Sequence, residues 1–490
     1  MRGFLASSIG VATAAALALP LALPTPSQAA AAPVAPAGST QSLPLVPLGP
    51  VAGRAARVPG TWAAPRAPEA QGLAAREVKT FSMVGVVWDD AATELHGRVQ
   101  VRTRSARTAA WSDWQDVETH NLEHAADPDA AERASGRVRG STAPLWVGES
   151  DGIEVRVQAE PGVGDRAGGP TTVHHLPSGM RIELVDPGDR TRTPAEDAKG
   201  RGDTWAGGGG WGSWAYGDGD DGDDGDGDGD DKGTTPLLPG MSMAAAEASY
   251  ANVPLAPLGA TEITAQNKAD STADANVLLD EQLSPGARPY IGPRPRIVTR
   301  RGWGADESLR ESGFVYTNTI KAAFVHHSAS GNNYECSEAP AVLRSLYRYH
   351  VVSSGWRDFG YNFAVDKCGN VYEGRAGGVA KAVLGAHTMG FNGNSMGVAV
   401  LGSYTNTNPP AAAVDAVARL TAWKLGLYGA NPLAKTTLKS GGGNLYAKGS
   451  NVSMNVISGH RDGFATECPG RKLYGKLGST RTTSARLQGR

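Results

Sequence analysis

A glycine- and aspartate-rich tract divides this 490-residue chain into two parts. Within it, nine aspartates are interspersed with glycines between Asp218 and Asp231. Repelling like charges on a glycine-rich backbone bury no apolar surface, so residues 187–293 are expected to form a disordered acidic linker. Calcium loops also use alternating aspartates, but no glutamate stands where the bidentate ligand of such a loop belongs. The tract therefore predicts a multidomain protein with folded parts on both sides.

Residues 1–29 have the pattern of a secretory signal peptide. Arg2 precedes an apolar run from Phe4 to Leu23, and small residues near Ala29 suit cleavage. A membrane anchor is the alternative, but the run is short and interrupted by proline. We expect export to an oxidising compartment, with no stable membrane insertion after cleavage.

The N-terminal part changes pattern near residue 76. Residues 30–75 are rich in alanine and proline without periodicity, which predicts a disordered leader. Residues 76–186 contain short β-prone runs with turn signals between them, which predict an all-β, sandwich-like module. The expected strands are Phe81–Trp88, His96–Arg104, Trp111–Val117, Ala143–Val147, Ile153–Ala159 and Met180–Val185. Trp111 and Trp114 could stack on carbohydrate, although packing in the module core is the favoured interpretation.

Residues 294–480 predict a mixed α/β domain with a central sheet flanked by helices. Expected strands are Ala322–His327, Tyr361–Asp366, Val371–Glu373, Met396–Leu401 and Val456–Ser458, and expected helices are Ser337–His350 and Val414–Leu427. From Arg296 to the end the chain has 23 Lys and Arg against 11 Asp and Glu. This excess suits anionic partners, or it keeps an exported domain soluble.

Histidine and cysteine motifs in this domain predict a zinc site. His326 and His327 stand in F-V-H-H-S, His460 in S-G-H-R-D and Cys468 in T-E-C-P-G. Two imidazoles and one thiolate bind zinc and leave a fourth position open, as catalytic sites require. Neighbours in a strand point to opposite faces, but the pattern does not choose between His326 and His327. Because Cys468 is the natural metal ligand, the other two cysteines, Cys336 and Cys368, are expected to form a disulfide.

Further motifs in the same order give a close family resemblance. They are R-R-G-W-G-A, G-W-R-D-F-G-Y-N-F, G-N-V-Y-E-G-R, G-A-H-T-M-G-F-N and S-M-G-V-A-V-L-G. Together with the histidine and cysteine motifs, they cover nearly all of residues 296–478. This region resembles the peptidoglycan recognition protein family, which is related to phage-type amidases that cleave N-acetylmuramoyl-L-alanine bonds. The N-terminal half resembles the β-rich module of secreted actinobacterial proteins.

The resemblance implies a zinc-dependent N-acetylmuramoyl-L-alanine amidase. Zinc would be bound by His326, His460 and Cys468. Tyr361 would donate to the developing oxyanion, and Thr466 would have a supporting role. The expected partner is peptidoglycan and the expected location is extracellular, at the cell wall. We expect a monomer that does not bind nucleic acid. A non-catalytic peptidoglycan-binding protein of the same fold is the alternative.

The resemblance also implies substrate contacts. The residues that match the family's groove are Trp356, Arg357, Arg375, His387 and Asn392. Either arginine could bind a stem-peptide carboxylate. Each could instead form a structural salt bridge, for example with Asp358 or Glu373. Glu373 as a general base is a further alternative, although its motif resembles a family turn.

Overall fold

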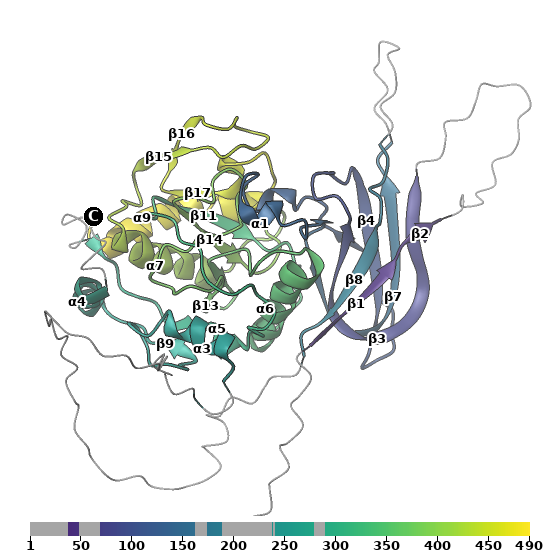
Figure 1. Ribbon diagram of the computed structural model, residues 1–490, viewed down its shortest axis with the longest axis horizontal. Coiled ribbons are helices and arrows are strands. Elements are labelled where there is room, and N and C mark those ends of the chain that lie inside the picture. Colours follow the sequence, from purple (N-terminus) through teal and green to yellow (C-terminus); the bar gives the residue numbers. More distant parts are fainter. Residues whose placement is uncertain (1–37, 49–68, 162–173, 189–237, 239–240, 279–289) are drawn as a thin grey trace, which may run out of the picture. The chain divides into compact units, whose positions relative to one another are not determined.

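The computed structural model describes residues 38–48, 69–161, 174–188, 238, 241–278 and 290–490 (Figure 1). The expected signal peptide and the aspartate-rich tract lie outside these residues. Among the residues that are described, no helix has both the length and the apolar character needed to cross a membrane.

Eight strands form one antiparallel sheet in the N-terminal module, in the order β1-β8-β3-β7-β4-β5, with β2 and β6 paired to β3. They are β1 (Ser39–Pro44), β2 (Val46–Pro47), β3 (Ala70–Trp88), β4 (Gly97–Ser105), β5 (Gln115–Val117), β6 (Gly140–Ser141), β7 (Leu145–Ala159) and β8 (Arg181–Asp186). In β4 the alternating Val99 and Val101 are buried while Arg98 is exposed, as the sequence predicts. The expected β-rich module is confirmed.

Part of the expected leader is folded, which corrects the boundary at residue 76. Residues 39–47 form β1 and β2, and β3 already begins at Ala70. β1 pairs with β8 along its whole length, and Leu45 is buried in the module core. Proline is tolerated in an edge strand, so cross-strand pairing orders a segment whose composition alone indicates disorder.

The prediction that Trp111 and Trp114 pack in the module core is wrong. Trp111 is 38% exposed, and neither indole belongs to the module core. The guanidinium of Arg156 lies 4.0 Å from the ring centroid of Trp114, and that of Arg102 lies 5.3 Å from the Trp111 ring. Cation–π contacts at the surface hold these side chains instead.

The last eight residues of β3, Phe81–Trp88, are buried on both faces of the sheet. Val84 and Val86 point into the module core. Met83 and Val87 belong to a second apolar cluster, which they share with Leu346 and other residues of the C-terminal domain. A continuous apolar contact therefore joins the two folded parts.

The C-terminal domain has a seven-stranded mixed sheet in the order β17-β11-β14-β12-β13-β10-β9. Its strands are β9 (Glu262–Ile263), β10 (Ile297–Val298), β11 (Ala322–His327), β12 (Phe363–Val365), β13 (Val371–Glu373), β14 (Ser395–Val400) and β17 (Ile457–Gly459), and a separate hairpin joins β15 (Lys435–Lys439) to β16 (Asn451–Asn455). Strands β17, β11, β14 and β12 run parallel. The expected mixed α/β domain is confirmed.

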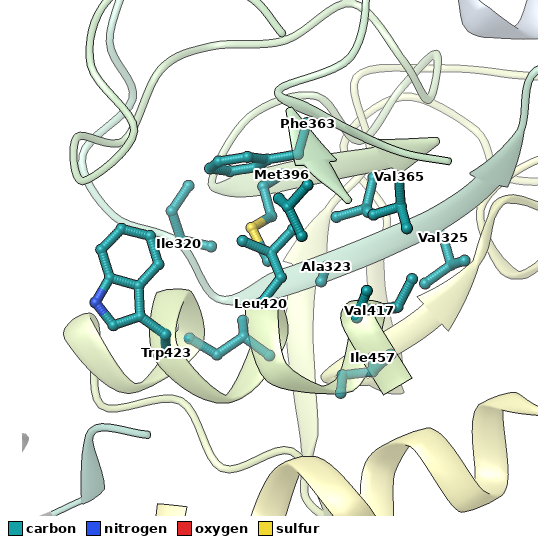
Figure 2. Packing of buried hydrophobic residues seen from close by; sticks show 14 of the residues in the cluster. Ile320, Ala323, Val325, Phe363, Val365, Met396, Val417, Leu420, Trp423 and Ile457 are labelled. Carbon is teal, nitrogen blue, oxygen red and sulfur yellow. The ribbon is translucent and has the colours of Figure 1, made fainter. Parts of the chain in front are cut away.

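Helices cover both faces of this sheet. They are α3 (Met243–Tyr250), α4 (Lys268–Leu278), α5 (Arg300–Trp303), α6 (Ala339–Arg348), α7 (Ala411–Leu427), α8 (Arg471–Tyr474) and α9 (Leu477–Gln488), with shorter turns at Cys336–Glu338, Tyr349–Ser353 and His460–Asp462. Figure 2 shows Leu420 and Trp423 of α7 packed near Ile320 and Met396. On the opposite face, Leu343 and Leu346 of α6 pack with Ala364 and Ala399 of the sheet.

The prediction that residues 187–293 form a disordered linker is also partly wrong, because residues 241–278 fold with the C-terminal domain. Ile263 of β9 is fully buried and pairs with Ile297 of β10. Asn252 donates to Glu373 Oε1 at 2.8 Å and accepts from the amide of Val379 at 2.9 Å. These contacts supply the order that the polar, proline-containing sequence does not indicate. The far boundary also moves from residue 480 to the end of α9.

Candidate metal centre

Strand alternation distinguishes the two adjacent histidines at the end of β11. His327 shares a face with Val325 in the core under α7, and its Nδ1 accepts from the amide of Tyr404 at 3.2 Å. His326 shares the opposite face with Phe324. It therefore points toward the other candidate ligands.

His460 reaches the same place from the neighbouring strand. β17 runs parallel to β11, with Gly459 opposite Val325, and His460 follows directly. The carboxyl ends of parallel strands meet at one edge of a sheet, where ligand sites usually form. The ring centroids of His326 and His460 are 4.6 Å apart.

Cys468 completes the predicted set from a turn pinned by backbone hydrogen bonds. Its Sγ lies 3.7 Å from Nδ1 of His326. The amide of Arg461 donates to the carbonyl of Cys468 at 3.0 Å, and the amide of Cys468 donates to Thr466 Oγ1 at 3.1 Å. The Cys336–Cys368 disulfide is present as predicted, and Cys468 is a free, buried thiol.

A fourth candidate ligand comes from the N-terminal module, where no metal ligand was expected. His124 ends a 3-10 turn, Leu122–His124, and lies 4.5 Å from His460 between ring centroids. One ligand atom from each of His124, His326, His460 and Cys468 lies within 4.8 Å of the others. All four side chains are buried.

The chemistry of this cluster fits a zinc ion. Within the described part of the chain, neither ring nitrogen of His124 or of His460 has a hydrogen-bond partner. Burial lowers the pKa of these imidazoles, to about 3 for His124, so they are neutral and available as ligands. Burial raises the pKa of the Cys468 thiol, and metal binding would displace its proton. Buried imidazole nitrogens and a thiolate sulfur are the ligands that zinc prefers.

His387 lies behind His326. Its Nδ1 is 3.3 Å from His326 Nε2 and 3.0 Å from Thr388 Oγ1, and its side chain is fully buried. A hydrogen bond to the second nitrogen of a metal-binding histidine fixes the tautomer and orientation of the ring. This position indicates support of a metal ligand, whereas the sequence suggested a substrate contact.

Tyr361 and Thr466 border the cluster. The Tyr361 ring centroid is 5.3 Å from that of His326, and burial keeps the phenol pKa well above its usual value, so the hydroxyl stays protonated. Thr466 Oγ1 donates to Glu123 Oε1 at 2.7 Å while it accepts from the amide of Cys468. Thr466 thus holds the cysteine turn and is itself tied to the N-terminal module.

The two predicted substrate arginines have other partners than those expected. Arg375 forms a bidentate pair with Glu132 of the N-terminal module, at 2.9 and 3.0 Å. The amide of Arg357 donates to the same carboxylate at 3.1 Å, and its side chain lies 3.8 Å from Glu311. Both arginines therefore form salt bridges within the protein, as the alternative predicted, although Asp358 and Glu373 are not their partners.

Asp358 and Glu373 serve a buried network of their own. Arg300 Nη1 donates to Asp358 Oδ1 at 3.0 Å, and the amide of Arg300 donates to Glu373 Oε2 at 3.1 Å. Glu373 also accepts from Asn252. Both of its oxygens are thus engaged away from the histidines, which argues against a general base.

Asn392 and Trp356 are also buried. Asn392 Oδ1 accepts from the amides of His387 and Thr388, at 2.7 and 3.0 Å, and its Nδ2 donates to Asp127 at 2.7 Å. Trp356 stacks on His350 with the ring centroids 4.4 Å apart. Substrate contact by these two side chains stays a prediction.

Sequence reasoning missed the residues between β5 and β6 that reach this site. Glu123, His124, Asp127 and Glu132 lie in a stretch without periodicity, and no motif relates them to the distant histidines. The one available signal was length, because residues 118–139 are far too many for a hairpin turn. Long connections in compact domains are usually functional.

Comparison with known proteins agrees with the two-part organisation. Residues 29–178 match a family described as the Rv3811 N-terminal galactose-binding domain-like family. Residues 316–471 match the N-acetylmuramoyl-L-alanine amidase family.

Individual relatives match the C-terminal domain. Peptidoglycan-recognition protein SC2 of Drosophila melanogaster is 32% identical over 183 residues, which are 37% of this chain and 84% of the relative. A human N-acetylmuramoyl-L-alanine amidase is 31% identical over 194 residues, or 39% of this chain and 26% of that protein. The solved structure of Drosophila PGRP-LB aligns at 25% identity with a TM-score of 0.30, over 37% of this chain and 92% of that one. The chain therefore belongs to the peptidoglycan recognition protein and N-acetylmuramoyl-L-alanine amidase family.

Proposed function

We propose that this protein is a zinc-dependent amidase that acts outside the cell and cleaves the bond between N-acetylmuramic acid and L-alanine in peptidoglycan. The convergence of His326, His460 and Cys468 beside Tyr361 carries the proposal. The similarity to a human N-acetylmuramoyl-L-alanine amidase supports the same reaction. The basic C-terminal domain suits an anionic wall polymer.

The chain's own residues divide the work of amide hydrolysis. When bound, zinc would polarise the scissile carbonyl and lower the pKa of a water molecule. His387 orients His326 through a buried hydrogen bond, which keeps its other nitrogen toward the cluster. Tyr361 holds a protonated hydroxyl beside the cluster and would donate to the oxyanion that develops during attack.

Product analysis tests the proposal. Purified peptidoglycan is incubated with the zinc-loaded full chain and with the variants described below, and the products are identified by mass spectrometry. We expect intact glycan strands and free stem peptides with a new L-alanine amino group. New reducing ends without free L-alanine amines would instead indicate a glycosidase, which needs a pair of carboxylates around a sugar bond.

A second candidate, non-catalytic recognition of peptidoglycan, is favoured by one observation. His124 adds a fourth protein ligand, and zinc sites closed by four ligands are typically structural. A recognition protein would bind peptidoglycan but release no peptide from it in any variant. Whether the protein is an amidase or a recognition protein therefore depends on whether His124 can move away from the metal centre.

A further inference from the structure

We propose that residues 121–134 of the N-terminal module, called the insert here, are a built-in inhibitor that occupies the substrate site and closes the metal centre. The inference rests on the proposed function and deepens it by assigning its regulation. Catalysis would require the insert to withdraw. The insert contacts the candidate metal ligands and the residues predicted to bind substrate.

At the metal centre, the insert supplies His124. Its ring lies 5.4 Å from His326 and 5.9 Å from Tyr361 between centroids. A catalytic zinc site keeps one position for water or substrate. With His124 as the fourth ligand, that position is filled by protein, and the imidazole stands beside the ring of Tyr361, whose hydroxyl would serve the oxyanion.

At the predicted substrate arginines, the insert supplies a carboxylate. Both oxygens of Glu132 bind Arg375, and both side chains are buried, with 8% and 5% exposed. Glu132 Oε1 also accepts from the amide of Arg357. A planar guanidinium recognises a carboxylate through two parallel hydrogen bonds. An acidic peptide would need the place that Glu132 holds.

Between these points the insert offers the carboxylate and carbonyl groups that an acidic peptide would offer. Asp127 Oδ1 accepts from Asn392 at 2.7 Å and from the amide of Gly390 at 2.8 Å. The carbonyl of Glu123 accepts from the amide of Met389 at 2.9 Å, and that of Ala125 accepts from Asn392 at 3.1 Å. Carboxylates and carbonyls of this kind are also the groups that a stem peptide offers. Insert and substrate therefore exclude each other.

Two pairs of variants test this inference on the zinc-loaded full chain. His124→Ala removes the fourth ligand, and His120→Ala changes an exposed histidine of the same connection as its control. Glu132→Gln removes the charge that holds Arg375 while keeping its shape. Asp129→Asn makes the same change at an exposed ion pair with Lys448, where 68% and 65% of the side chains are accessible.

We expect His124→Ala and Glu132→Gln to hydrolyse a soluble N-acetylmuramoyl peptide faster than the unmodified chain, by roughly 10-fold or more because a buried pair is broken. The two controls should match the unmodified chain. If any of these chains cleaves the peptide, rates in both test variants that stay equal to or fall below the unmodified rate, with zinc retained, would overturn the inhibitory role.

Two measurements do not depend on catalysis. In the cobalt-loaded chain, His124→Ala should change the visible absorption of the ion, because a ligand is exchanged, and His120→Ala should not. Glu132→Gln in a Tyr361→Phe background should bind the same soluble peptide more tightly than Tyr361→Phe alone. An unchanged cobalt spectrum would remove His124 from the centre, and unchanged peptide affinity would show that Glu132 does not block the site. If the cobalt spectrum and the peptide affinity both change while no variant cleaves, the blocking role of the insert is supported and the amidase proposal fails.

Discussion

The two sides of the metal centre are built in different ways. His326 and His460 follow neighbouring parallel strands, and Cys468 is held by a hydrogen-bonded turn. His124 stands at the end of a three-residue turn in a long connection of another domain. The first side owes its geometry to a sheet with a large apolar core. The second owes it to polar contacts with its neighbours and to a small apolar cluster that includes Leu122 and Ala125. One side is preorganised for binding a metal, whereas the other can be exchanged.

The largest expected effect comes from breaking the preorganised side. Cys468→Ser replaces a soft thiolate with a weak hydroxyl ligand, so the chain should lose most of its zinc. Metal analysis after dialysis measures this. In comparison, His124→Ala should keep the metal, because the thiolate and both preorganised histidines remain in place. Full zinc retention by Cys468→Ser, or equal loss in both variants, would contradict the difference between the two sides.

Removal of the Tyr361 hydroxyl tests the same side without touching a ligand. Tyr361→Phe should keep zinc and the fold but lower kcat on the order of 10²–10³-fold, the usual cost of one oxyanion donor. The comparison is best made with Glu132→Gln present in both chains, so that the insert does not mask the effect. Unchanged turnover would show that Tyr361 only packs against His326.

A smaller effect is expected from the residue that orients His326. His387→Ala removes the hydrogen-bonded partner of a ligand, and loss of such a partner typically weakens metal affinity about 10–100-fold. Competition with a zinc chelator measures the affinity. His327→Asn is the control, since His327 lies on the other face of β11 and the new amide oxygen can still accept from Tyr404. Equal losses in the two variants would indicate general destabilisation.

The smallest effect concerns the contact between the two domains. The hydroxyl of Tyr349 donates to the carbonyl of Thr142 at 3.0 Å in a buried setting. Tyr349→Phe should lower the free energy of unfolding by about 1 kcal/mol, because the carbonyl loses its partner. Chemical denaturation measures the change. Tyr250→Phe alters an exposed tyrosine and should have no effect; an equal effect of both would mean that the Thr142 bond contributes nothing.

The same division explains what could be predicted from the sequence. The preorganised ligands lie in short motifs whose residue types carry the chemistry and single out the histidine pair, His460 and Cys468. The family resemblance then selects His326 from the pair. Strand alternation then separates His326 from His327 only when the packing of each face is known.

The rest depends on contacts between distant segments. Residues 39–47 and 241–278 have the composition of linkers, yet pairing with β8 and the contacts of Asn252 order them. His124 has no local signal, because its role arises only when the module packs against the C-terminal domain. Sequence patterns predict local structure well, but they do not predict contacts between segments that are distant in the sequence.

The insert lies within a closed loop, residues 118–139, which is anchored by paired strands at both ends: β5 stops at Val117 and β6 starts at Gly140. An opened loop of this kind stays attached and can return, so displacement by a ligand would be reversible. A single proteolytic cut within residues 118–139 would leave two separate ends, each held at only one point. Recapture of both halves would then cost additional chain entropy. The topology thus allows a reversible response to substrate and a one-way activation by a protease from the same segment.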